Sequence, residues 1–573
     1  MNIYTYINKN SKAVWVPALF YALGCIVLFT MVNYEGFTWC KDELYQSICV
    51  SRYSEAPLGL LTYYIGHLWT DIFGFTVVNL RYLTQVEILF AILLPTIFLY
   101  GLCPNRTLCA LAFLMGCLMV KVCAFHIYNW DTGTYLFDSI AICLLISAIS
   151  KPSLLKYILL GFGIGLMTMG RITSGVFLPF ALVVVLFANR YNHSAYPYWR
   201  AFAGIVCAWI VCVLLVICLT VGSPAAYLDI LGAGNVVSGH SPTSDFGRLY
   251  YRLRVIATHS TLTWTPGVGC MLLAVILPFI KKRIVKWLLV GGWICVCVLL
   301  SISIMFDGPE YPLLRGGDTP VGLALIIACP VYALFGGPKP SKLMQIELWS
   351  FVLLLVAISF GSDGYVERMI VGFSLPLLVG VVWKNGSEAI RRYVAYSVGM
   401  CVLVFGIMLG TQFANLYRLS KSESAVCVET PPFRNLKLME LPFNELDKAG
   451  EAVEFLLDRQ IPYAYLGEFY LIELVYGQNV GPSFHNFHDN TARSLTWFKC
   501  KDDILSKAEA IVYVPDLPNF ESDEILPDLY NEGFTDAVSI GEAVILFRSG
   551  KAPETTTEKR IESEISGVDP KDL

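Results

Sequence analysis

The chain has 573 residues, of which 15% are charged and 56% are hydrophobic, and its mean hydropathy is +0.60. Apolar runs recur at lengths near the roughly 20 residues that cross a hydrocarbon core, which excludes an ordinary soluble protein. The formal net charge of −4 excludes a basic nucleic-acid-binding protein, so no nucleic-acid partner is expected. The sequence therefore indicates an all-α polytopic membrane protein.

Apolar segments predict about 13 membrane-spanning helices within residues 1–416. The first segment follows Lys9 and Lys12 and lacks a small-x-small cleavage site, so we expect a retained span and not a signal peptide. The expected spans are 13–33, 84–101, 107–125, 132–149, 155–169, 172–188, 201–222, 262–280, 287–305, 319–336, 345–361, 369–383 and 393–414.

The charges of the loops predict the orientation of these spans. If the N-terminus is cytoplasmic, the cytoplasmic loops carry most of the lysines and arginines, including the run at 281–286, and Glu388 is their only acid. The opposite loops are acidic, which is the positive-inside pattern. The Asn-x-Ser/Thr sequons all fall on the cytoplasmic side, which favours a bacterial inner membrane over a glycosylated lumenal face.

After the last span the composition becomes that of a soluble domain, expected at 417–548 on the extracytoplasmic side. A helix at Asn444–Asp458 and strands at 462–466, 508–515 and 543–547 indicate a small α/β domain. The charged tail 549–573 lacks aromatic residues and is expected to be disordered.

The stretch from Tyr34 to Gln85 lies between the first two predicted spans and contains the acidic pair Asp42-Glu43. It is too polar to cross a bilayer and too aromatic for a simple linker, so we expect it to lie along the membrane surface. Carboxylates at a membrane boundary are candidates for a general base or a ligand site, and a solvated loop start is the alternative.

This order of residues resembles the first external loop of the GT-C membrane glycosyltransferases, and it is especially similar to the aminoarabinose transferases of lipid A and the protein O-mannosyltransferases. The family's second acidic residue corresponds to Asp131, which opens the fourth span, and its glycine-rich segment to residues 161–171. The resemblance covers residues 1 to about 190. The matching residues of the first loop are Asp42 and Glu43, then Tyr53, Glu55, Pro57 and Leu58, then Phe73, Gly74 and Arg81.

The resemblance implies an inverting transfer of a sugar from a polyprenyl-phosphate donor to an envelope lipid, glycan or protein on the extracytoplasmic face. Such a reaction needs a carboxylate that takes the acceptor's proton and cations that stabilise the departing phosphate. Asp42 would be the base, with Glu43 and Asp131 positioning the acceptor or the base. The remaining candidates for substrate binding are Glu55, Arg81, His126, Arg171 and Arg368.

Two departures from the family pattern affect phosphate binding. The family's lysine before the proline is Ala56 here, and the lysine that ends the glycine-rich span is Arg171. A guanidinium group binds phosphate through two parallel hydrogen bonds, whereas an ammonium group acts as a point charge. The mode of phosphate binding is therefore expected to differ from that of the family.

Each candidate also has a structural interpretation. Arg81 could mark the end of a span, and Glu367-Arg368 could be a loop ion pair of small energetic worth. The glycines at 161, 163 and 165 lie in an apolar span without a flanking strand, so helix packing explains them better than dinucleotide binding. Plain loops are favoured for the external residues His240, Arg315, His485 and His488.

The 18 cysteines lie mostly in apolar spans and include no metal-binding motif, although a divalent cation is left open by the family resemblance. Two disulfides, Cys40–Cys49 and Cys427–Cys500, are candidates that spacing alone does not establish.

Two other functions compete with glycosyl transfer. A non-catalytic transporter or flippase of lipid-linked sugars would carry charged residues within its spans, and the spans here are largely free of charge. A polysaccharide polymerase or ligase would carry large arginine-rich external loops, for which residues 240–262 give only a weak signal.

Overall fold

The structure is a computed structural model. It describes residues 41–102, 128–191, 196–237, 280–306, 425–428, 433–434, 436–466, 471–476, 501–502, 504–515 and 522–553, together with isolated residues within 108–116, 269–277 and 346–407. The expected spans at 13–33 and 319–336 lie outside these residues, and those at 107–125, 262–280, 345–361, 369–383 and 393–414 are described only in part.

Apart from the second span, the described spans match the sequence expectation closely in position. Helices long and apolar enough to cross a membrane occupy Val77–Phe98, Thr132–Ser150, Ile172–Arg190 and Tyr198–Thr220. They belong to the elements α4 (Val77–Leu102), α6 (Trp130–Ser150), the 3-10 turn η4 (Ile172–Val176) with α8 (Phe177–Tyr191), and α9 (Tyr198–Thr220). The shorter apolar helix α7 (Leu154–Gly170) lies among them, and α13 (Arg283–Phe306) covers the expected span at 287–305.

The second span begins earlier than the sequence predicted. α4 starts at Val77 instead of residue 84, so that Arg81 is inside a helix and is not at a loop exit. The physical reason is a buried partner for Arg81 in α2 (Lys41–Ser51), which removes the need to keep this arginine in water.

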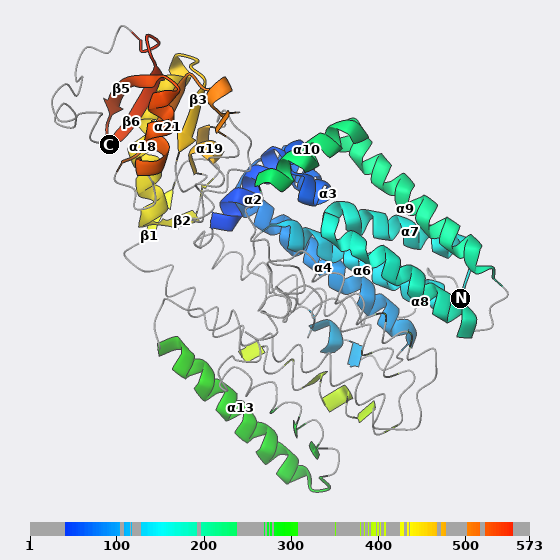
Figure 1. Ribbon diagram of the computed structural model, residues 1–573. Coiled ribbons are helices and arrows are strands. Elements are labelled where there is room, and N and C mark those ends of the chain that lie inside the picture. The colour runs from blue at the N-terminus through cyan, green and yellow to red at the C-terminus, as the bar shows by residue number, and fades with distance from the viewer. Residues whose placement is uncertain are drawn as a thin grey trace.

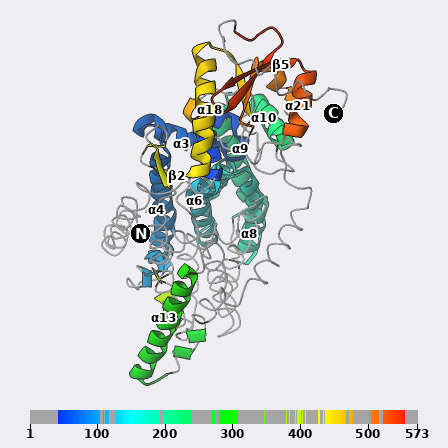
Figure 2. The same ribbon diagram turned by 90° about the vertical axis from the view of Figure 1, so that its left-hand side faces the viewer.

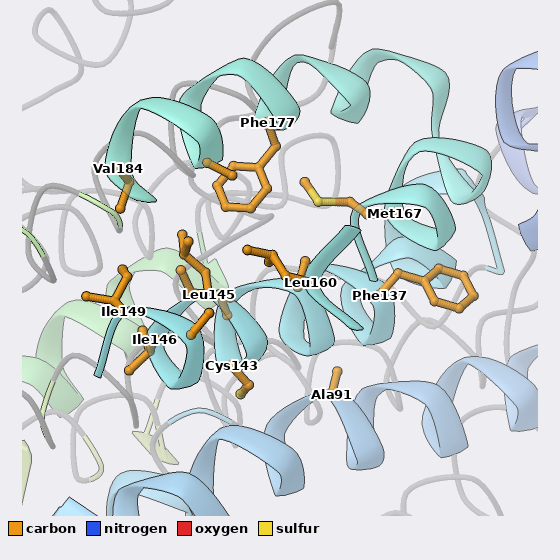
Figure 3. Close-up of a cluster of buried hydrophobic side chains, with 14 of the residues drawn as sticks. Ala91, Phe137, Cys143, Leu145, Ile146, Ile149, Leu160, Met167, Phe177 and Val184 are labelled. Carbon is orange, nitrogen blue, oxygen red and sulfur yellow. The ribbon is translucent and has the colours of Figure 1, made fainter. Parts of the chain in front are cut away.

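The helices pack in the order α4, α6, α7 and α9, with α8 against α6 and α9 (Figure 1). A continuous apolar cluster joins them, and Figure 3 shows Ala91, Cys143, Leu160 and Phe177 meeting in it from four helices. Glycines bring α7 close to the backbone of α9 and to a side chain of α6. A Cβ on Gly161 would lie 2.1 Å from the Ile205 carbonyl oxygen of α9, and one on Gly163 would lie 3.0 Å from Leu144 of α6. The packing interpretation of these glycines is confirmed.

The C-terminal domain contains a sheet with strand order β3-β4-β6-β5. β3 (Tyr463–Leu466) and β4 (Ala510–Tyr513) are parallel, whereas β6 (Ala543–Arg548) is antiparallel to both β4 and β5 (Phe534–Ile540). The three predicted strands are confirmed, and β5 was missed. A separate hairpin pairs β1 (Ala425–Val428) with β2 (Leu436–Met439).

Both faces of this sheet are covered. α18 (Glu440–Asp458) and the short α19 (Leu471–Tyr476) share an apolar cluster with one face, and α21 (Ser522–Asn531) shares another cluster with the opposite face. Successive residues of β3 alternate between the two clusters, as the period of a strand requires. The domain lies beside α2 and the first turn of α4 (Figures 1 and 2), and Leu44, Ile48, Val77 and Val78 belong to its first cluster.

One expectation about the chain's polar segments needs correction, and one stays a prediction. Residues 549–553 were assigned to a disordered tail, but the Ser549 amide donates to the Gly533 carbonyl at 2.8 Å and the Gly550 amide to Asp536 at 2.8 Å. The segment is therefore tied to the β5 strand, and residues 554–573 lie outside the described residues. Cys49 is buried in α2 and Cys40 lies outside the described residues, so the Cys40–Cys49 disulfide stays a prediction.

Candidate active site

The first external loop is folded into short helices. α2 is followed by two 3-10 turns, η2 (Tyr53–Glu55) and η3 (Pro57–Gly59), and then by α3 (Leu60–Phe73). α3 ends at Gly74, whose φ of +87° favours glycine, and the Asn79 side chain donates to the carbonyls of Phe73 and Gly74 at 2.7 and 2.9 Å. These contacts fix the turn that leads into α4.

Glu43 and Arg81 form a buried ion pair between α2 and α4. Arg81 Nε donates to Glu43 Oε1 at 2.7 Å and Arg81 Nη2 donates to Glu43 Oε2 at 2.8 Å. The two side chains are 3% and 5% exposed, for Glu43 and Arg81 respectively. The guanidinium of Arg81 thus gives two donors to Glu43. This geometry indicates that Arg81 holds α2 in place, and it does not favour the expected contact of Arg81 with phosphate.

The other contacts of α2 lead to α3. Gln46, one turn after Glu43, accepts a hydrogen bond from the Tyr63 hydroxyl. In the next turn, Val50 contacts the backbone at Gly66, where a Cβ would lie 2.9 Å from the valine side chain. One face of α2 is therefore fixed against α3 and α4 at three successive levels.

Thr62 of α3 joins two further segments of the membrane region. Its hydroxyl donates to the Gly170 carbonyl at 3.0 Å, and its own carbonyl accepts from the Tyr128 hydroxyl. Its methyl group lies where a Cβ on Gly133 would stand, at 2.1 Å. Thr62 thus connects the end of α7 with the beginning of α6.

The beginning of α6 carries Asp131. Asn129 caps this helix, because its Oδ1 accepts from the Thr132 amide at 2.7 Å while its own amide donates to Thr132 Oγ1 at 3.0 Å. The helix dipole stabilises an acid in the first turn of a helix. Helix stability alone could therefore explain an aspartate at position 131, apart from its proposed chemical role. The side chains of Asp42 and Asp131 lie outside the described residues, although their backbones belong to α2 and α6.

Arg171 follows α7 directly and is 5% exposed. Its amide donates to the Met167 carbonyl at 3.1 Å, and its carbonyl accepts from the Ser174 amide at 2.9 Å. Thr173 Oγ1 and Ser174 Oγ are buried and have no hydrogen-bond partner within the described part of the chain. Buried hydroxyl groups are normally satisfied, so two such donors beside an arginine are suited to an anionic ligand.

The remaining expected residues are exposed or lie outside the described residues. Glu55 is exposed on the turn η2, whereas His126 and Arg368 lie outside the described residues, as do His240, Arg315, His485 and His488. Cys427 lies in β1 and Cys500 is not described. The described residues hold no group of three or more His, Cys, Asp or Glu side chains that could bind a metal ion.

Sequence reasoning missed several buried polar residues. Glu87 in α4 and Asp138 in α6 are buried acids inside spans that were described as largely free of charge, and both interrupt apolar runs. Thr173 and Ser174 come two and three residues after Arg171, which was a usable signal. No signal in the sequence marks Thr62, because its partners Tyr128 and Gly170 lie 66 and 108 residues away.

Comparison with known proteins adds limited support. No family model matches the sequence, and no curated protein matches it. Two solved structures of ArnT from Cupriavidus metallidurans, in the apo state and bound to undecaprenyl phosphate, each align with 93% of this chain and 97% of theirs at 14% identity, with TM-scores of 0.43 and 0.42 respectively. ArnT is a GT-C aminoarabinose transferase, from the group that the first external loop resembles. A TM-score below 0.5 does not establish a shared fold, so the function has to be inferred from the residues of this chain.

Proposed function

We propose that the protein is a GT-C-type membrane glycosyltransferase that moves a sugar from a polyprenyl-phosphate donor to an envelope lipid, glycan or protein. The main observation in support is that the first loop brings together three segments at one end of the helices. These are α2 with Asp42 and Glu43, the start of α6 with Asp131, and the end of α7 with Arg171. The C-terminal domain lies at the same end, as the proposed extracytoplasmic location of both requires.

The proposed reaction is an inverting displacement at the anomeric carbon of the donor sugar. Asp42 takes the proton from the acceptor's nucleophilic group as that group bonds to the sugar, and the bond from the sugar to the phosphate oxygen breaks. Arg171 stabilises the charge that develops on the departing polyprenyl phosphate. The hydroxyl groups of Thr173 and Ser174 donate to the same phosphate, which gives their buried oxygen atoms the partner that they lack in the described part of the chain.

The Glu43–Arg81 pair positions the base in this account. Glu43 precedes Gln46 by one turn and adjoins Asp42, so a fixed Glu43 fixes the backbone that carries the base. Asp131 orients the acceptor from the start of α6, and the exposed Glu55 contacts it from η2. His126 and Arg368 remain proposed substrate ligands by resemblance alone.

The test is the transfer rate of purified Asp42→Asn, with labelled lipid-linked sugars extracted from host membranes as donors and a host envelope fraction as acceptor. Loss of a general base costs about 10²–10⁴-fold, so the variant should retain at most about one hundredth of the wild-type rate. Asp71→Asn is the matched control, because Asp71 is a 59% exposed acid of the same loop that pairs with His67 at 3.5 Å. Wild-type activity in the Asp42 variant would exclude this base.

The buried acids Glu87 and Asp138 favour a transporter or flippase as the second candidate. Such a protein would move a labelled lipid-linked sugar across reconstituted vesicles without transferring it. Vesicles that show movement but no transferred sugar, with the envelope acceptor present, would support the transporter and exclude the enzyme.

A further inference from the structure

We infer that the C-terminal domain is a working part of the catalytic unit, because its helix α19 holds α2 in the position that the reaction needs. The inference rests on the proposed function, in which α2 carries the base. It assigns a role to a soluble domain whose composition alone suggested none.

The two sides of α2 contact different parts of the molecule. Glu43, Gln46 and Val50 recur at helical spacing and face α3 and α4. Leu44 and Ile48, four residues apart on another side of the helix, are buried in the apolar cluster of the C-terminal domain. α2 therefore lies between the membrane region and the domain, with a polar and close-packed contact on one side and an apolar contact on the other.

The domain supplies α19 to this contact. α19 packs against α2 and against α18, and its Ile472 is 1% exposed within the same cluster as Leu44 and Ile48. Behind it, Tyr465 and Val512 continue the cluster onto the sheet. The position of α2 is thus linked through α19 to the folded core of the domain.

α2 depends on this support. In proteins most helical stability comes from tertiary packing and not from the helix alone, and the described part of α2, Lys41–Ser51, is packed on two sides. Tertiary contacts must therefore hold its position, and loss of one of its two packed sides should loosen it. A base misplaced by about 1 Å can cost about 10²-fold in rate, so small changes at α19 should be visible in turnover.

The test compares Ile472→Ala with Leu529→Ala in the full-length protein. Leu529 is 0% exposed in α21 and packs on the opposite face of the sheet, so its truncation weakens the same domain without touching the α2 side. We expect Ile472→Ala to lower kcat by about 10-fold or more, because α2 carries the base. KM for the lipid-linked donor should change less than about twofold, because Arg171 lies at the end of α7 and not on α2. Leu529→Ala should leave both values within about twofold.

Hydrogen exchange provides a readout that does not depend on the reaction. Amides of Lys41–Ser51 should exchange faster in Ile472→Ala and at the wild-type rate in Leu529→Ala. Unchanged exchange in the Ile472 variant, or faster exchange with an unchanged kcat, would overturn the inference. The double variant Ile48→Ala/Ile472→Ala should lose less activity than the product of the two single losses, and independent losses would count against a shared contact.

Failure of this inference is distinguishable from failure of the proposed function. If Asp42→Asn is inactive and Ile472→Ala behaves like Leu529→Ala, only the positioning role of the domain is wrong. If Asp42→Asn keeps wild-type activity, the base assignment is wrong whatever the exchange of α2 shows.

Discussion

The membrane region around the first loop and the C-terminal domain are held together by different contacts. In the membrane region, glycines bring helix backbones together, and buried polar groups such as Glu43, Arg81 and Thr62 join separate helices. In the domain, apolar side chains cover both faces of the sheet, and the ion pairs are partly exposed, as between Lys448 and Glu542 with 26% and 58% exposure.

This difference follows from the surroundings of each region. Lipid tails are as apolar as leucine, so apolar burial drives helix association weakly in a membrane, and close packing with polar contacts has to supply the specificity. A domain in water gains about 25 cal/mol for each Å² of apolar surface that it buries. We therefore expect polar and glycine substitutions to be most damaging in the membrane region.

The largest expected effect is at the buried ion pair. Arg81→Met leaves Glu43 buried without its guanidinium partner, and removal of one partner of such a pair costs about 3–5 kcal/mol. Lys448→Met, which breaks the exposed pair with Glu542, should cost less than about 1 kcal/mol. Unfolding in detergent measures both changes, and equal losses would contradict the contrast between the regions.

The next effect concerns close helix packing. Gly161→Ala would press a methyl group onto the Ile205 carbonyl of α9 and should destabilise the protein by about 1–3 kcal/mol. Gly291→Ala in α13 is the matched control, because its Cβ would meet nothing within 4 Å. Alanine there should be neutral or stabilise by about 0.5–1 kcal/mol. A harmless Gly161 variant would show that α7 and α9 are not in backbone contact.

A smaller effect separates binding groups from structural ones. Ser174→Ala removes a hydroxyl without a partner in the described part of the chain, so it should leave stability unchanged and weaken undecaprenyl phosphate binding by about 3–10-fold. Thr168→Val is the comparison, because its hydroxyl donates to Ile164 at 2.7 Å and accepts from Trp209 at 3.0 Å. That variant should lose stability, and the reverse pattern would remove Ser174 from the phosphate site.

The sequence predicted most of the local structure and little of the long-range contacts. Apolar runs located α6, α7 and α9, and β-branched runs located β4 and β6, because these signals repeat within a few residues. The predicted start of α4 was wrong because Arg81 is paired with an acid 38 residues away. The second packed side of α2 could not be predicted, because its partner α19 comes from the other end of the chain.

The smallest effect is a pH dependence of the C-terminal domain. Burial, and secondarily Tyr530, raises the pKa of Tyr513 from 10.0 to about 12. Since the folded pKa is above the unfolded one, this stabilising contribution is complete below pH 10 and is lost as the pH rises toward about 12. Pulse proteolysis of the full chain should show this decline, and Tyr513→Phe should reduce it. Equal slopes for both proteins would exclude the tyrosine as its cause.

The central claim is that a lipid-linked phosphate binds where α7 ends, beside the loop that carries the base. Its most direct measurement is the affinity of purified protein for undecaprenyl phosphate, by native mass spectrometry, with Arg171→Gln compared with Arg190→Gln. Arg190 is an exposed arginine in the last turn of α8. We expect Arg171→Gln to weaken the affinity for undecaprenyl phosphate by about 10-fold or more and Arg190→Gln to keep the wild-type affinity. Wild-type affinity in the Arg171 variant would contradict the claim.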